Sequence, residues 1–160
     1  MLDDTLVFSQ IQPITVSVAS NYPGTQGPSP GVYDTIGVVP SPGGSGGFGQ
    51  MGVVAASPIK FTITASLAQI FQGPANATLL VQVQDSPDNV NWGVTDMTEV
   101  LAENLAALQI PGQIIITSVI PAIGGSTNPP GPVQRYIRIF YVVANGPFTA
   151  GAVNARIDMM

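Results

Sequence analysis

The sequence predicts an all-β protein, and three observations carry that prediction. Several segments alternate apolar and polar residues with a period of two, as strands with one buried face do, most cleanly from Ile59 to Leu67. The 18 Gly and 15 Pro gather between such segments, where they form turns. Helix is indicated in one region alone, where Leu101–Leu108 favours one or two helical turns and the preceding Thr95–Val100 is ambiguous between helix and strand.

We therefore expect a single jelly-roll or β-sandwich domain over residues 1–160. It should contain about seven or eight strands, long Gly/Pro-rich loops and at most one short helix. A chain of this length is able to bury a sizeable core.

Alternation is weaker in the N-terminal part. Residues Leu2 to Phe8 are mixed and predict an arm or a first strand. The residues Ile14, Val16 and Val18 alternate with small or polar ones, which predicts a strand over 14–19 directly after Pro13. A further brief strand is expected over Val32–Val39.

Residues 20–58 form a Gly/Pro-rich stretch, densest between Pro40 and Gly49. Loops of this length in small domains are usually functional or disordered. The apolar residues Phe48, Met51 and Val53 follow the glycines, and solvated linkers seldom carry such residues. We expect an extended arm that docks on a partner. The alternative is a flexible loop whose apolar residues fold back on the domain.

The C-terminal part carries the clearest strands. Those at Ile59–Leu67 and Leu79–Gln84 are joined by a short turn, which predicts an adjacent antiparallel pair. A strand over Gln113–Ile120 follows. The most strand-like segment, Arg135–Asn145, then leads through Gly146 and Pro147 into Ala152–Asp158, and we expect these two segments to form a closing hairpin.

Composition limits the classes of function. Charged residues make up 8% of the chain, against about 25% in typical globular domains, so we expect much of the surface to face other protein. The net charge is −5, and four scattered basic residues cannot track a phosphate backbone, so no nucleic-acid binding is expected. The start of the chain does not resemble a secretory signal, and no run of about 18 apolar residues occurs, so we expect no membrane span.

Few residues suit catalysis or metal binding. The absence of Cys excludes disulfides and thiolate metal sites, and the absence of His removes the commonest general base. The remaining close acid pairs are Asp85 with Asp88 and Asp96 with Glu99, spacings that turns and caps also require. Calcium binding by Asp85 and Asp88 would lack the calcium-loop spacing and its closing Glu. We expect neither an enzyme nor a cofactor.

Two arginines and one tryptophan are candidates for binding. If alternate residues of the Arg135–Asn145 strand are buried, Arg138 points to the other face, and Arg156 likewise opposes Val153 and Ala155. Each arginine is then either solvated or paired across strands, or presented to an acidic partner surface. Trp92 either closes the core at a turn or offers a platform for a sugar.

Three segments together resemble the capsid decoration, or cement, proteins of tailed bacteriophages. They are the opening MLDDTLVFSQ (1–10) before Ile14-Thr15, VQVQDSPD (81–88) running to Trp92, and RYIRIFY (135–141) before a C-terminal strand. The resemblance implies a jelly-roll-like homotrimer on the outer surface of an icosahedral capsid, made in the host cytoplasm. It would bridge major capsid proteins and resist the pressure of packaged DNA.

The same resemblance implies no catalytic residue, no cofactor, no direct nucleic-acid contact and no membrane contact. The candidate interface residues are Phe48, Met51, Val53, Arg138 and Arg156. The alternative function is a carbohydrate- or receptor-binding jelly-roll module of a phage tail or fibre, in which Trp92 and the tyrosines would form an exposed aromatic patch.

Overall fold

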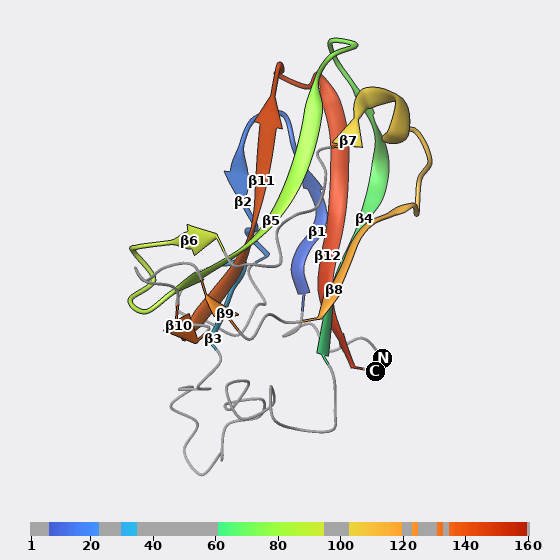
Figure 1. The fold of residues 1–160 in the computed structure, drawn as a ribbon. Helices are drawn as coiled ribbons and strands as arrows, with labels where there is room; N and C mark the ends of the chain where they lie inside the picture. The colour runs from blue at the N-terminus through green and yellow to red at the C-terminus, as the bar shows by residue number, and fades with distance from the viewer. Residues whose placement is uncertain are drawn as a thin grey trace.

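The computed structural model describes residues 7–22, 30–34, 61–94, 103–119, 123–124, 131–132 and 135–159. Within these ranges the chain forms two antiparallel sheets packed as a sandwich, so the expected all-β class is confirmed (Figure 1). Seven of the described strands are three residues or longer. The helix in the described part of the chain is a 3-10 turn, Leu105–Ala107, capped by the side chain of Asn104. No helix in the described ranges is long and apolar enough to cross a membrane.

Sheet A contains four strands in the order β1-β12-β4-β8. Their bounds are Val7–Pro13 (β1), Ala150–Met159 (β12), Phe61–Gln72 (β4) and Ile114–Val119 (β8). The longest register in this sheet joins β12 to β4, and β1 carries two register shifts against β12.

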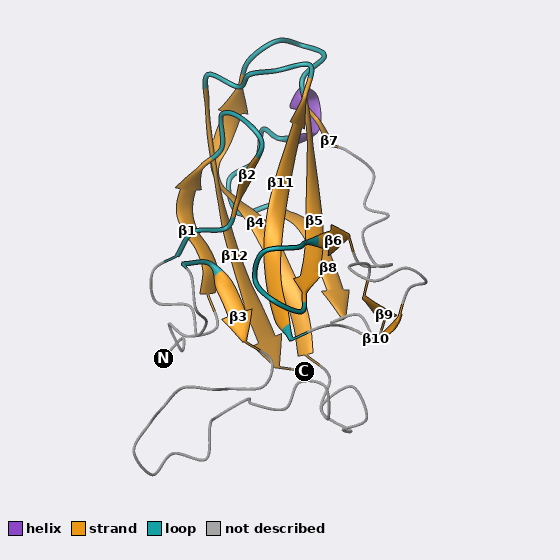
Figure 2. Ribbon diagram, turned by 90° about the vertical axis from the view of Figure 1, so that its left-hand side faces the viewer, coloured by secondary structure: helices purple, strands orange, loops and turns teal. Residues whose placement is uncertain are grey.

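Sheet B follows the order β2-β11-β5-β6, with β3 added on β11 and β7 on β5. The bounds are Val18–Ala19 (β2), Tyr136–Ala144 (β11), Thr78–Ser86 (β5), Gly93–Val94 (β6), Val32–Asp34 (β3) and Glu103–Asn104 (β7). Figure 2 shows β11 and β5 running side by side. A separate two-stranded ribbon pairs β9 (Ile123–Gly124) with β10 (Gly131–Pro132).

The period of two predicted from the sequence builds the core between the sheets. Along 63–67 of β4, 78–83 of β5 and 136–142 of β11, buried residues alternate with more exposed ones that face outward. The buried residues include Ile63, Ala65 and Leu67 on β4, Leu79, Val81 and Val83 on β5, Ile137, Ile139 and Tyr141 on β11, and Val153 and Ala155 on β12.

Both expected hairpins are wrong. Strands β4 and β5 belong to different sheets, and so do β11 and β12. The connections 73–77 and 145–149 instead cross from one sheet to the other at the upper end of the sandwich in Figure 1. The buried residues of these crossings explain why, since Ala77 and Phe148 lie in the core and the Phe148 ring meets that of Phe71 edge-on, with 4.8 Å between ring centres.

The expected strand over 14–19 is also largely wrong. Strand β1 ends at Pro13, the chain bends over 14–17, and only Val18–Ala19 forms β2. Here the chain passes from sheet A to sheet B, so Ile14 is buried while Val16 is 57% exposed. Backbone and side-chain bonds replace strand pairing at this bend, including Ile14 N–H to the Gly151 carbonyl at 3.0 Å.

Part of the expected arm, 20–58, is described and is attached to sheet B. Ser20 accepts the N–H of Ile139 on its Oγ at 3.2 Å and donates from the same Oγ to the Gly31 carbonyl at 2.6 Å. Gly31 has φ +70, and a Cβ there would lie 2.0 Å from the Ser20 carbonyl oxygen, so only glycine fits. The expected strand over Val32–Val39 is β3 as far as Asp34. Phe48, Met51 and Val53 lie outside the described residues.

Candidate functional site

The two candidate arginines lie on the outer faces of different sheets. Arg138 projects from β11 between the buried residues Ile137 and Ile139, so it faces outward from sheet B. Arg156 projects from β12 and is exposed on sheet A, next to the buried residue Ala155. The outward orientation expected from alternation is confirmed. Because the two sheets are the two layers of a sandwich, however, the arginines cannot contribute to one flat contact surface.

Arg138 is held between two aromatic rings. Its guanidinium carbon lies 4.1 Å from the centre of the Trp92 ring and 5.3 Å from that of Phe140. Both separations are in the range of cation–π contacts. Partial burial lowers the pKa of Arg138, but an arginine remains charged at neutral pH. The result is a fixed positive charge on the outer face of sheet B.

Two glutamines complete this cluster. Arg138 Nε donates to Gln84 Oε1 at 2.9 Å, and Gln84 Nε2 donates to Gln82 Oε1 at 3.1 Å. Arg138 and Gln84 face each other in the β11–β5 register, as do Phe140 and Gln82. The side-chain carbonyl of each glutamine therefore accepts one hydrogen bond within the cluster, and Gln84 is itself buried.

An apolar pair of residues lies next to this cluster on the outward face of sheet B. Val142 lies opposite Leu80 in the β11–β5 register, and both side chains are half-buried. We call this outward surface of sheet B the B face. Its members are Leu80, Gln82, Gln84, Trp92, Arg138, Phe140 and Val142.

A tight turn holds Trp92 in position. The Asp88 carboxylate accepts the backbone N–H groups of Val90 and Asn91, at 2.9 and 2.8 Å, and the side-chain amide of Asn91 at 2.6 Å. These hydrogen bonds, to the two backbone groups above all, hold the pKa of Asp88 well below its ordinary value. Asp88 thus fixes the chain just before Trp92, which is the turn-capping role expected for it.

The acid pairs do not assemble a reactive centre in the described part of the chain. Asp85 is fully buried at the end of β5, whereas Asp88 is exposed in the turn. No group of three or more possible metal-ligating side chains was found among the described residues. Asp96 and Glu99 lie outside these residues.

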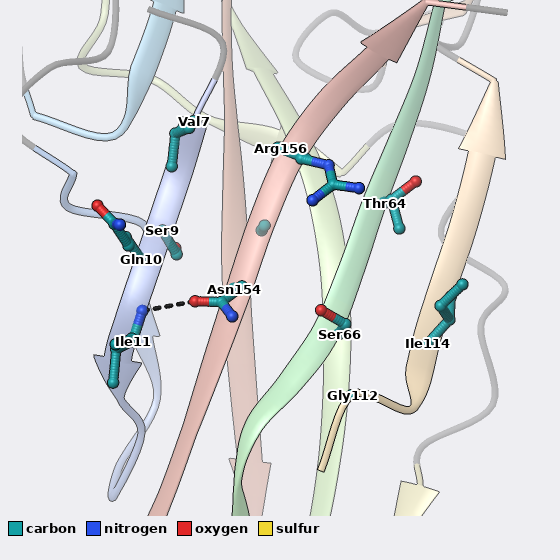
Figure 3. Close-up of a pocket in the computed structure, with 11 residues that line it drawn as sticks. Val7, Ser9, Gln10, Ile11, Thr64, Ser66, Gly112, Ile114, Asn154 and Arg156 are labelled. Atoms are coloured by element: carbon teal, nitrogen blue, oxygen red, sulfur yellow. Dashed lines mark hydrogen bonds between the residues drawn. The ribbon is translucent and has the colours of Figure 1, made fainter. Parts of the chain in front are cut away.

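Sheet A carries a shallow open pocket of about 490 Å³ around Arg156. Figure 3 shows Arg156 reaching from β12 toward Thr64 on β4, with Ser66 and Ile114 further along the same surface. The Ile11 N–H donates to Asn154 Oδ1 at 2.7 Å, which fixes the irregular part of β1 where Ile11 has φ +46. Among the described residues that line it, Arg156 is the only charged one, and they supply no pair of carboxylates for acid–base chemistry.

A protein-family model named Bbp16 matches residues 48–157, which is more than half of the chain. The chain belongs to the Bbp16 family. This family is phage-related, in agreement with the phage origin implied by the sequence resemblance. The Bbp16 match contains every member of the B face, whereas β1, β2 and β3 precede it. A comparison with curated proteins finds no match.

Sequence analysis missed the partners of Arg138. In this member of the Bbp16 family, the sequence predicts Trp92 to be a turn residue or a sugar platform, and it predicts only a strand for Gln82 and Gln84. The signal that could have joined them is the β5–β11 pairing, which places Gln84 opposite Arg138. The sequence does not reveal that pairing, because β5 and β11 are far apart along the chain.

Proposed function

We propose that this chain is a structural virion protein, a decoration or cement subunit that binds the outer face of an icosahedral phage capsid. The observation that carries the proposal is the B face, where one ordered arginine lies among aromatic, apolar and amide side chains. Arg, Trp and other aromatic residues are enriched at protein–protein contacts and at their energetic hot spots. The role requires no catalytic residue and no cofactor.

The partner in this proposal is the major capsid protein. Charged residues make up only 8% of the chain, so its surface can carry few charges. Such a surface suits permanent contacts with other protein better than free diffusion in solvent. The phage-related family makes the capsid a natural source of such contacts. We place the chain on the outer capsid surface, as a homotrimer that bridges neighbouring capsid subunits, so that weak contacts add through avidity.

The Gly/Pro-rich arm is a second part of this proposal. The apolar residues Phe48, Met51 and Val53 would dock on the shell, and proline in the arm would reduce the entropy lost on docking. Deleting residues 40–49 should weaken binding to the shell more than it lowers the stability of the domain. Equal losses of binding and of stability would remove the arm from the proposal.

The direct experiment uses shells of the same phage from which this protein has been removed. Adding the purified chain should raise the melting temperature of these shells, and the bound protein should sediment with them. An unchanged melting temperature with no cosedimentation would refute the cement role.

The alternative function, a carbohydrate- or receptor-binding module of a tail or fibre, depends on an accessible aromatic surface. The guanidinium of Arg138 covers one face of the Trp92 ring, which leaves less of that ring for stacking on a sugar. Binding to a glycan array, lost on replacing Trp92 and unaffected by stripped shells, would favour the alternative.

A further inference from the structure

The guanidinium of Arg138, whose nitrogens form a planar fork, has N–H donors without an acceptor among the described residues. A guanidinium carries five N–H donors, and in the part of the chain that the structure describes only Nε has a hydrogen-bond acceptor, Gln84 Oε1 at 2.9 Å. Among the described residues nothing accepts from the two terminal nitrogens, and we take their donors to be available to a ligand. Trp92 and Phe140 hold the guanidinium plane in place before any ligand arrives.

The side-chain amides of Gln82 and Gln84, next to the Arg138 guanidinium, also bear on which ligand this surface can bind. Gln84 gives its Oε1 to Arg138 and its Nε2 to Gln82, so Gln82 accepts through its own Oε1. Each glutamine carbonyl already accepts one hydrogen bond inside the cluster, whereas no acceptor is found among the described residues for the terminal nitrogens of Arg138 or the Nε2 of Gln82, so donors outweigh acceptors there. A ligand that matches them supplies acceptors and negative charge.

We infer that the terminal nitrogens of Arg138 bind the carboxylate of one Asp or Glu side chain on the capsid protein, as a bidentate pair. This inference rests on the proposed function and specifies the group that the B face recognises. The planar fork matches a carboxylate with two parallel hydrogen bonds. Phe140 lies beside the fork, and the half-buried residues Val142 and Leu80 extend the apolar surface along the same face, so a docked partner would shield the pair from water on that side.

A carboxylate fits better than a phosphate. Phosphate chains are held by several basic residues, and the sequence has four in all; among the described residues, sheet B offers Arg138 and, stacked 4.9 Å from the Tyr136 ring centre, Arg135. The net charge of −5 repels polyanions as a whole, whereas a single carboxylate in a protein loop meets one local fork.

The test measures cosedimentation of the purified chain with stripped shells of the same phage over a range of protein concentrations. Arg138→Gln and Arg138→Lys should each raise the dissociation constant at least about tenfold, because lysine keeps the charge but lacks the fork. The control is Arg156→Gln. Arg156 was a candidate interface residue from the sequence, but it lies on sheet A, away from the B face, so this inference gives it no part in binding and the affinity of the variant should stay within about twofold of the wild type. Circular dichroism and melting temperature establish that each variant is folded.

A second experiment uses only the wild-type protein and so does not depend on the folding of a variant. The carboxylates of the shells are converted to methylamides with a carbodiimide and methylamine, and wild-type binding should then fall to the level of Arg138→Gln on untreated shells. If wild-type protein does not bind untreated shells, the cement role and this inference fail together. If it binds but Arg138→Lys binds equally well, or if amidation leaves wild-type binding unchanged, the carboxylate is wrong and the cement role stands.

Discussion

The phenol of Tyr141 on β11 donates a hydrogen bond to Oγ of Ser9 on β1, with 2.8 Å between the oxygens, inside the core of the sandwich. Ser9 Oγ donates onward to Gln12 Oε1 at 2.7 Å, and Gln12 Nε2 donates to the Ala19 carbonyl at 2.8 Å. Burial raises the pKa of Tyr141 well above its ordinary value of 10.0, so the phenol stays protonated and remains a donor. This buried polar chain joins sheet A to sheet B.

Removing the phenol oxygen should destabilise the domain modestly. Tyr141→Phe keeps the ring but deprives Ser9 of a donor, and we expect a loss of about 1 kcal/mol in the free energy of unfolding. Ser9→Ala should cost about 1–3 kcal/mol, because it leaves the buried phenol without an acceptor. Urea denaturation of both variants and of the double variant gives the coupling. The double variant should lose less than the sum, and strict additivity would contradict the bond.

The crossing from β11 to β12 should depend on Phe148. This ring is 2% exposed and packs on Phe71, so Phe148→Ala should leave a cavity and cost about 3–5 kcal/mol. The neighbouring residue Thr149 is exposed, and Thr149→Ala should stay within about 0.5 kcal/mol of the wild type. Chemical denaturation measures both, and equal stabilities of the two variants would mean that Phe148 does not anchor this crossing.

Asp88 predicts a specific dependence on pH. Its pKa in the folded state is depressed below the ordinary value of 3.8, so the carboxylate stabilises the fold at pH values above 3.8. This contribution is lost as the pH falls below that value toward the folded-state pKa. Asp88→Asn should therefore melt at a lower temperature than the wild type at neutral pH, with the difference shrinking between about pH 4 and pH 2. A difference that stays constant over that range would contradict the assignment.

Stacking on Trp92 should be visible by fluorescence, because Trp92 is the only tryptophan in the chain. Arg138→Gln removes the group 4.1 Å from the ring centre, so the emission should shift and quenching by acrylamide should rise. The matched variant Arg156→Gln lies on the other sheet and should leave both quantities unchanged. Identical spectra for the wild type and Arg138→Gln would show that the stacking is absent in solution.

The proposed trimer makes a prediction about mass. Light scattering after size exclusion should give about 50 kDa, three times the 16.5 kDa of one chain. A single species at the mass of one chain, even at high protein concentration, would argue against a preformed trimer.

The interior of the sandwich could be predicted from the sequence, whereas the pairing of its strands could not. Alternation along 59–67 and 135–145 correctly assigned Ile63, Ile139 and Arg138 to their faces, because a period of two depends only on local geometry. Turn residues predict that the chain reverses direction, but they do not indicate whether the next strand joins the same sheet or the opposite one. The expected hairpins failed for that reason, since the buried side chain of Phe148 carries the chain across the core.

Contacts between segments that are distant along the chain could not be predicted either, because sequence periodicity depends only on local geometry. Ser9 and Tyr141 are 132 residues apart, and neither has a periodicity that points to the other. The candidate site shows the same division, because the outward orientation of Arg138 was predictable and its position between Trp92 and Phe140 was not. That position depends on the Asp88 turn and on the β5–β11 register together.

An electron-microscopy map of the assembled particle tests the central claim most directly. We predict density for this chain on the outside of the shell, with the B face against the capsid protein and an acidic side chain of that protein at Arg138. Density with the B face turned to solvent, or a particle without this chain on its outer surface, would contradict the account.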